Sequence, residues 1–92
     1  MNARAWRWLR LALLLVLAAC SRPLPDESSP GALVYVQQCG LCHPPHHPGL
    51  MKAEMWKVQV ARMAEIRARR GLPPLSPTEE KLILDYLTRH SG

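Results

Sequence analysis

Residues 1–19 combine three arginines, no acid and a run of nine apolar residues, which is the pattern of a secretory signal, so only 73 of the 92 residues remain to build a folded domain. A chain of that size is marginal for a core made of side chains alone, and domains this small commonly need disulfides, a metal, a partner or a cofactor. The three cysteines are an odd number, which argues against a simple disulfide framework. The sequence therefore predicts one small domain whose core is completed by something other than its side chains.

The amino-terminal segment joins a basic head to a short apolar run. Arg4, Arg7 and Arg10 are its only charged residues, and nine apolar residues follow at 11–19. A membrane-spanning helix needs about 20 apolar residues, so this run is too short to form a stable one. A basic head, a short apolar centre and small residues at the end are typical of a secretory signal.

The end of this segment carries a more specific pattern. Leu17-Ala18-Ala19-Cys20 resembles the lipobox of bacterial lipoproteins. The resemblance implies cleavage before Cys20, attachment of lipid to its sulfur and amino group, and anchoring in a bilayer on the periplasmic side. Several acyl chains on one residue anchor firmly, because each buried CH₂ contributes roughly 0.8 kcal/mol. Ser21, by the same resemblance, implies sorting to the outer membrane. An uncleaved anchor and ordinary signal cleavage nearby are the alternatives.

Residues 20–30 are expected to form the lipidated cysteine and a flexible tether. Three prolines, three serines and two acids stand between residues 21 and 30, and such a composition cannot bury a core. The folded domain is therefore predicted to span residues 31–92.

The charge of the working chain is smaller than that of the full sequence. The full sequence has a net charge of +5, but beyond residue 19 only nine Lys and Arg residues face seven acids. This modest excess in an exported chain argues against nucleic-acid binding. We interpret Arg67, Arg69 and Arg70 as a solvated helix end, where cations complement the helix dipole.

From residue 30 onward the pattern predicts three helices and no sheet, which is the all-α class. The first helix has Ser29 as its N-cap and Pro30 in its first turn, and it runs to about residue 38. The second runs over about 52–70 and stops at Gly71. The third begins at a capping box with proline in the first turn, Ser76-Pro77-Thr78-Glu79. Its apolar stripe comprises Leu82, Ile83, Tyr86 and Leu87.

The chemistry lies between the first two helices, in Cys39-Gly40-Leu41-Cys42-His43. This is C-x-x-C-H, the attachment signature of c-type haem. Two thiols three residues apart can form thioethers with the two vinyl groups of a porphyrin, and the next residue, His43, can then ligate the iron. One covalent haem c would supply the apolar plate that so small a domain lacks.

The motif has two other interpretations. A thiol-redox or structural pair is typically found beside a βαβ pattern, which this sequence does not show. A zinc site could use Cys39, Cys42 and two of His43, His46 and His47. Structural zinc prefers two separated pairs of ligands, whereas these five residues crowd into nine positions. Haem attachment is therefore the favoured interpretation.

Residues around the motif extend the pattern over positions 30–92. They are Gly31-x-x-x-Tyr35 before the motif, Pro48-Gly49-Leu50 after it, Trp56 and Met63 on the middle helix, and Ile83-x-x-Tyr86-Leu87 on the last. This pattern resembles class I cytochromes c. The resemblance implies a small cytochrome c-like bundle of about three helices wrapped around one covalent haem.

The same resemblance implies two further features. The first and last helices would cross through Gly31, Tyr35, Tyr86 and Leu87. In the family, a proline carbonyl in the loop after the motif accepts a hydrogen bond from the ring N–H of the proximal histidine. Pro48 is the candidate for that role, which fixes the tautomer and basicity of the imidazole.

The sixth ligand of the iron is expected to be Met63. Trp56, Val60 and Met63 fall on one face of the second helix, at 100° per residue, so Met63 lies within an apolar face that could wall a haem. Met51 is the main alternative. The less favoured alternatives are Met55, His46 or His47 as the ligand, and an open coordination site.

A methionine-ligated haem favours electron transfer, because both axial positions are filled. The expected function is a membrane-tethered carrier of single electrons between periplasmic redox proteins, and not an enzyme by itself. A haem-based gas or redox sensor and a cytochrome subunit of a larger oxidoreductase complex are the alternatives.

Overall fold

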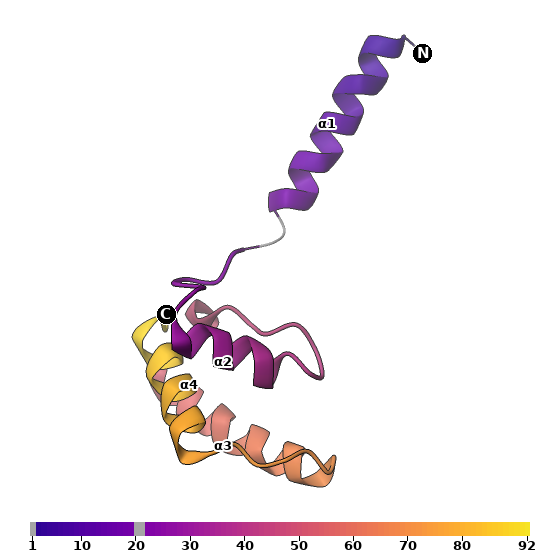
Figure 1. Ribbon diagram of the computed structural model, residues 1–92. Coiled ribbons are helices and arrows are strands. Elements are labelled where there is room, and N and C mark those ends of the chain that lie inside the picture. Colours follow the sequence, from indigo (N-terminus) through magenta and orange to yellow (C-terminus); the bar gives the residue numbers. More distant parts are fainter. Residues whose placement is uncertain (1, 20–21) are drawn as a thin grey trace.

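The computed structural model describes residues 2–19 and 22–92 (Figure 1). Over these ranges the chain is helical and has no strand, which confirms the all-α class. Its elements are α1 (Ala3–Ala19), α2 (Pro30–Cys39), the short 3₁₀ helix η1 (Pro48–Leu50), α3 (Ala53–Arg69) and α4 (Pro77–Arg89). The three helices expected after residue 30 are therefore α2, α3 and α4.

Local signals fix where these helices begin and end. The Ser29 hydroxyl accepts a hydrogen bond of 3.3 Å from the Ala32 N–H, which caps α2. Ser76 and Glu79 form the expected capping box at the start of α4, with reciprocal bonds of 3.1 Å. The chain leaves α3 through Gly71, whose φ of +70° lies in the left-handed region that glycine adopts without strain.

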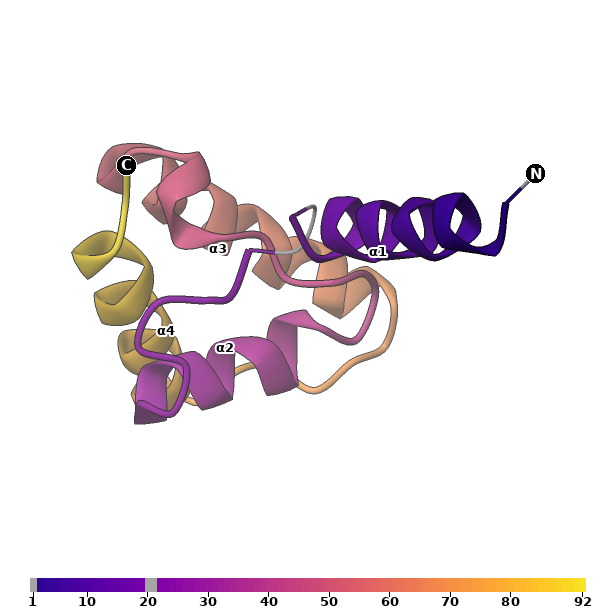
Figure 2. The same cartoon turned by 90° about the horizontal axis from the view of Figure 1, so that it is seen from above.

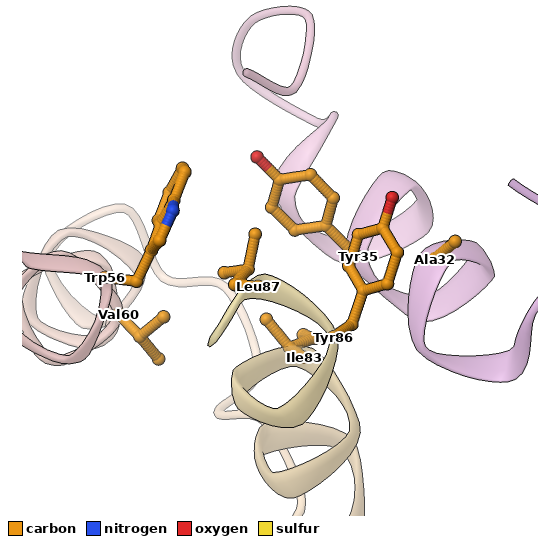
Figure 3. Close-up of a cluster of buried hydrophobic side chains, with 7 residues drawn as sticks. All are labelled: Ala32, Tyr35, Trp56, Val60, Ile83, Tyr86 and Leu87. Atoms are coloured by element: carbon orange, nitrogen blue, oxygen red, sulfur yellow. The ribbon is translucent and has the colours of Figure 1, made fainter. Parts of the chain in front are cut away.

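Helix α4 is the centre of the packing, because both α2 and α3 contact it. Figure 2 shows α2 and α3 both extending to the right of α4, with α3 above α2 in this view. The core is one cluster of buried side chains contributed by these three helices (Figure 3): Ala32, Tyr35, Trp56, Val60, Ile83, Tyr86 and Leu87.

Helices α2 and α4 meet at Gly31, Tyr35 and Tyr86. A Cβ added to Gly31 would stand 2.8 Å from the Tyr86 Cβ and 2.9 Å from the Leu82 carbonyl oxygen, so the two backbones approach closely there. The Tyr35 ring lies 5.8 Å from the Tyr86 ring and 6.4 Å from the Trp56 ring, in tilted and edge-to-face arrangements. Tyr35 thus joins all three helices in the core.

Residues 24–29 are held against the domain, although the sequence predicted a tether there. Leu24 is half-buried and packs against the core cluster. The Tyr86 hydroxyl donates a hydrogen bond of 2.8 Å to the Pro25 carbonyl oxygen. Asp26 turns the chain with φ at +46°, and its carbonyl oxygen accepts from the Ser29 N–H at 3.0 Å. Composition indicated no core in this segment, but a single leucine and one backbone carbonyl suffice to dock it.

Helix α1 stands apart from the other three helices in Figure 1. Across the described parts of the chain, no helix has both the length and the apolar character that a membrane crossing requires. The proposed lipidation site, Cys20, and the sorting residue, Ser21, lie outside the described residues.

Candidate haem site

One cavity of about 140 Å³, partly open to solvent, adjoins the C-x-x-C-H motif. It is formed by the end of α2, the loop that follows, the second half of α3 and the segment after α3. Its lining residues are Gln38, Cys39, Cys42, His43, Met63, Ile66, Arg67, Arg70 and Leu72. Both motif cysteines, the motif histidine and the expected sixth ligand therefore line the same space.

The two motif cysteines are placed by the end of α2. Cys39 is the last residue of the helix, and the Gly40 N–H closes it with a bond of 3.0 Å to the Val36 carbonyl oxygen. Cys39 is half-buried, Cys42 is exposed, and both are free thiols. Burial raises the pKa of the Cys39 thiol above its ordinary value, and the positive charge of Arg67 opposes that rise. Neither cysteine of the motif is therefore held in a disulfide.

His43 is held in one orientation by its neighbour. Its Nδ1 lies 2.9 Å from the Pro44 carbonyl oxygen, and because a carbonyl can only accept, this bond requires the proton on Nδ1. The Nε2 lone pair is then left for a metal, in the manner of ligating histidines whose other nitrogen donates to a carbonyl.

The carbonyl beside His43 therefore belongs to Pro44, whereas the resemblance led us to expect Pro48. The Pro48 carbonyl oxygen has another partner in the structure: it accepts a buried hydrogen bond of 2.7 Å from the indole Nε1 of Trp56. Pro48 itself is buried, so its contribution here is to fix the loop to α3.

The loop of residues 44–50 is attached to the core by its backbone. The Tyr35 hydroxyl donates to the His46 carbonyl oxygen at 2.7 Å, and the Pro48 carbonyl is held by Trp56. His47 caps η1, since its Nδ1 accepts from the Gly49 N–H at 2.9 Å. The exposed His46 ring lies 5.0 Å from the His43 ring. A stiff, anchored loop thus follows the motif and keeps His43 at the cavity.

The methionines are in different surroundings. Met63 is half-buried, one turn beyond the buried Val60, and lines the cavity with Ile66. Met51 packs against the core cluster instead, and its carbonyl oxygen accepts from the Gly92 N–H at 2.9 Å. Met55 is 48% exposed. Of the three, Met63 is the one that lines the cavity together with the motif.

Arg67 has a role that the sequence analysis missed. We interpreted it with Arg69 and Arg70 as a solvated helix end, and those two residues are exposed. Arg67 is half-buried, and its guanidinium donates to the carbonyl and side-chain oxygens of Gln38 and to the Pro73 carbonyl oxygen. Its position four residues after Met63 was the available signal, because that spacing places both side chains on one helix face.

No protein-family model matches the chain, and no curated protein or solved structure is significantly similar to it. Within residues 2–19 and 22–92, no group of three or more His, Cys, Asp or Glu side chains is arranged to hold a metal ion. The donor set at the cavity is instead two thiols, one imidazole and one thioether, and this set fits a covalent haem.

Proposed function

We propose that the mature protein is a lipid-anchored monohaem c-type cytochrome that carries single electrons between redox partners on the periplasmic side of a membrane. The observation that carries the proposal is the lining of one cavity by Cys39, Cys42, His43 and Met63. These residues are the two thiols and the two axial ligands that a c-type haem takes from its protein.

Each residue has a separate task in this proposal. Cys39, the last residue of α2, and Cys42, three residues further on, would form the thioethers and so tie the haem to the end of this helix. His43 offers Nε2 to the iron, while the Pro44 carbonyl holds its Nδ1 proton. When bound, the haem supplies reversible one-electron chemistry between its ferric and ferrous states.

The choice of Met63 over Met51 as sixth ligand is supported by their surroundings. Met63 lines the cavity with the motif residues, whereas Met51 packs on the core cluster and has its backbone bonded to Gly92. A thioether ligand raises the reduction potential, and two filled axial positions leave no site for a substrate. This arrangement favours electron transfer over catalysis.

The first test is for covalent haem. The full chain, expressed with a cytochrome c maturation system, is expected to give a c-type pyridine haemochrome with one haem per chain. Replacing Cys39 or Cys42 by alanine is expected to abolish two-thioether attachment, whereas His46→Ala, at the exposed loop position, is the matched control and keeps it. A wild-type protein that is folded and colourless would overturn the proposal.

The second test identifies the sixth ligand. Met63→Ala is expected to remove the near-infrared sulfur-to-iron band of the oxidised protein, and the exposed Met55→Ala is the control that retains it. If the band survives in Met63→Ala and disappears in Met51→Ala, the ligand is Met51. Rapid carbon monoxide binding by the reduced wild-type protein at neutral pH contradicts the carrier and favours a sensor.

The anchor has a test of its own. Mass spectrometry of the protein extracted from membranes is expected to find Cys20 as the first residue, carrying acyl groups. An unmodified first residue or an intact segment 1–19 contradicts the lipid anchor and leaves the haem assignment untouched.

A further inference from the structure

Arg67, on α3, is hydrogen-bonded to the end of α2 beside the motif cysteines. Its Nη1 donates to the Gln38 carbonyl oxygen at 3.0 Å, and its Nη2 reaches Gln38 Oε1 at 3.1 Å. Nε and Nη2 also reach the Pro73 carbonyl oxygen, at 3.2 and 2.8 Å. The guanidinium is a planar, permanently charged fork, so it holds these acceptors in a fixed relative geometry.

The acceptors belong to segments that meet at the cavity. Gln38 lies in the last turn of α2, immediately before Cys39, where helix carbonyls have no partner within the helix and carry the negative end of its dipole. Arg67 itself lies one turn beyond Met63 on α3 and lines the cavity beside it. The guanidinium therefore ties the helix that ends in the first thiol to the helix that carries the proposed sixth ligand.

The hydrogen bonds of Gln38 also reach α4. The Gln38 side-chain amide donates to Glu79 Oε2 at 3.1 Å, and the other oxygen of Glu79 closes the capping box with Ser76. The main contacts of α2 and of α3 are both with α4, and in the core these two helices touch directly through the edge-to-face pair of Tyr35 and Trp56. At the cavity, the hydrogen bonds of Arg67 to Gln38 add a second, polar link between α2 and α3.

We propose that Arg67 is a positioning residue that holds Met63 at its ligating distance by clamping α3 to the end of α2. This inference rests on the proposed haem function, since it concerns the residue proposed as the sixth ligand. Arg67 itself would not contact the iron. Without the clamp, the second half of α3 would move more freely, and Met63 would be held less firmly at the position from which it could ligate the iron.

The test uses the haem-loaded full chain with Arg67→Gln, and Arg69→Gln as the matched control. Arg69 is on the same helix, loses the same charge, and is exposed in an ion pair of 3.7 Å with Glu65. In Arg67→Gln we expect carbon monoxide to bind the ferrous protein about tenfold faster than in wild type, because binding requires departure of the methionine. The near-infrared band of the ferric protein is expected to weaken at a temperature well below unfolding. Arg69→Gln is expected to match the wild type in both readouts.

A second variant keeps the test decisive if Arg67→Gln folds poorly. Arg67→Lys retains the charge but has no fork to hold Gln38 and Pro73 together, so it is expected to show the same faster binding. Full rescue by lysine would overturn the clamp in favour of a simple charge effect. If both variants keep the wild-type rate of carbon monoxide binding and the wild-type near-infrared band, the inference is overturned and the haem carrier is not. The same holds if the haem of the wild-type protein is not ligated by Met63. Absence of covalent haem from wild type overturns the proposed function itself.

Discussion

The indole nitrogen of Trp56 donates a hydrogen bond of 2.7 Å to the carbonyl oxygen of Pro48, and both residues are fully buried. This bond joins α3 to the loop that follows the C-x-x-C-H motif. Trp56 also packs edge-to-face on Tyr35, whose hydroxyl holds the same loop at the His46 carbonyl. Two aromatic residues of the core therefore fix the path of the chain after His43.

Trp56→Phe is expected to lower the free energy of unfolding by about 1–3 kcal/mol, because the Pro48 carbonyl stays buried and loses its donor. Urea denaturation followed by far-ultraviolet circular dichroism measures the change. Val58→Ala, at an exposed position of the same helix, is the control and is expected to change stability little. A Trp56→Phe protein as stable as wild type contradicts the importance of the bond.

The two tyrosines give the protein a predictable response to alkali. Burial raises the pKa of Tyr35 far above its ordinary value, and nearby Cys39 and Tyr86 add to the rise. Burial also raises the pKa of Tyr86, followed by the negative charges of Asp26 and Glu27. A raised pKa means that the folded state keeps its proton, so the stabilisation is complete below the ordinary value near 10 and falls as pH rises above it.

Tyrosinate absorbance is therefore expected to appear together with alkaline unfolding and not as a separate transition near pH 10. A titration followed in parallel by ultraviolet difference absorbance and circular dichroism tests this, with unfolded protein in urea as the reference. Tyr35→Phe leaves Tyr86 alone to titrate and isolates its contribution. Ionisation of both tyrosines near the ordinary pKa in a protein that remains folded is the contrary result.

Glu79 makes the start of α4 sensitive to acid. Hydrogen bonds from Ser76, first its backbone N–H and then its side chain, lower the pKa of the Glu79 carboxyl, and Gln38 and Arg67 lower it further. A lowered pKa in the folded state gives stability that is present above the ordinary carboxyl value and is lost as pH falls through the lowered one.

Glu79→Gln is accordingly expected to reduce the thermal midpoint of unfolding at pH 7 and to flatten its decline between about pH 5 and pH 2. Differential scanning calorimetry over that range is the measurement. Glu80→Gln, one residue further at an exposed position, is the matched control. Parallel acid profiles for wild type and Glu79→Gln would count against this role.

Local signals made the helices predictable, whereas long-range hydrogen bonds were not. Ser76 and Gly71 mark helix ends through the few residues beside them, and the structure confirms both. The partners of Arg67 and Trp56 lie in other elements, and no periodicity or spacing specifies them. The same distinction holds at the cavity: the motif itself indicated Cys39, Cys42 and His43, whereas the bonds of Arg67 to Gln38 depend on how the chain folds back.

The effect of replacing Gly31 depends both on local helix propensity and on the long-range packing of α2 against α4. Glycine inside a helix normally costs stability relative to alanine, so Gly31→Ala would stabilise an isolated α2. In the domain the added carbon meets the Tyr86 Cβ at 2.8 Å, and neither backbone can yield without moving α4. We expect Gly31→Ala to lower the free energy of unfolding by about 1–3 kcal/mol. Gln37→Ala, exposed on the same helix, is the control for helix propensity, and a gain in stability at both positions contradicts the close crossing.

The docked segment before α2 provides the last prediction. Glu27 lies in the stretch that Tyr86 holds through the Pro25 carbonyl, so a protease that cuts after glutamate needs local opening of this segment to cleave there. Tyr86→Phe keeps the buried ring but removes the donor, and we expect cleavage after Glu27 to become about fivefold faster, as loss of one hydrogen bond of about 1 kcal/mol implies. Cleavage after Glu65, within α3, reports opening of the domain as a whole and is the internal control. Equal cleavage rates after Glu27 in wild type and Tyr86→Phe would mean that the segment behaves as the free tether expected from its composition. A parallel rise in cleavage after Glu27 and Glu65 would mean that the Tyr86 hydroxyl stabilises the whole domain and not this segment.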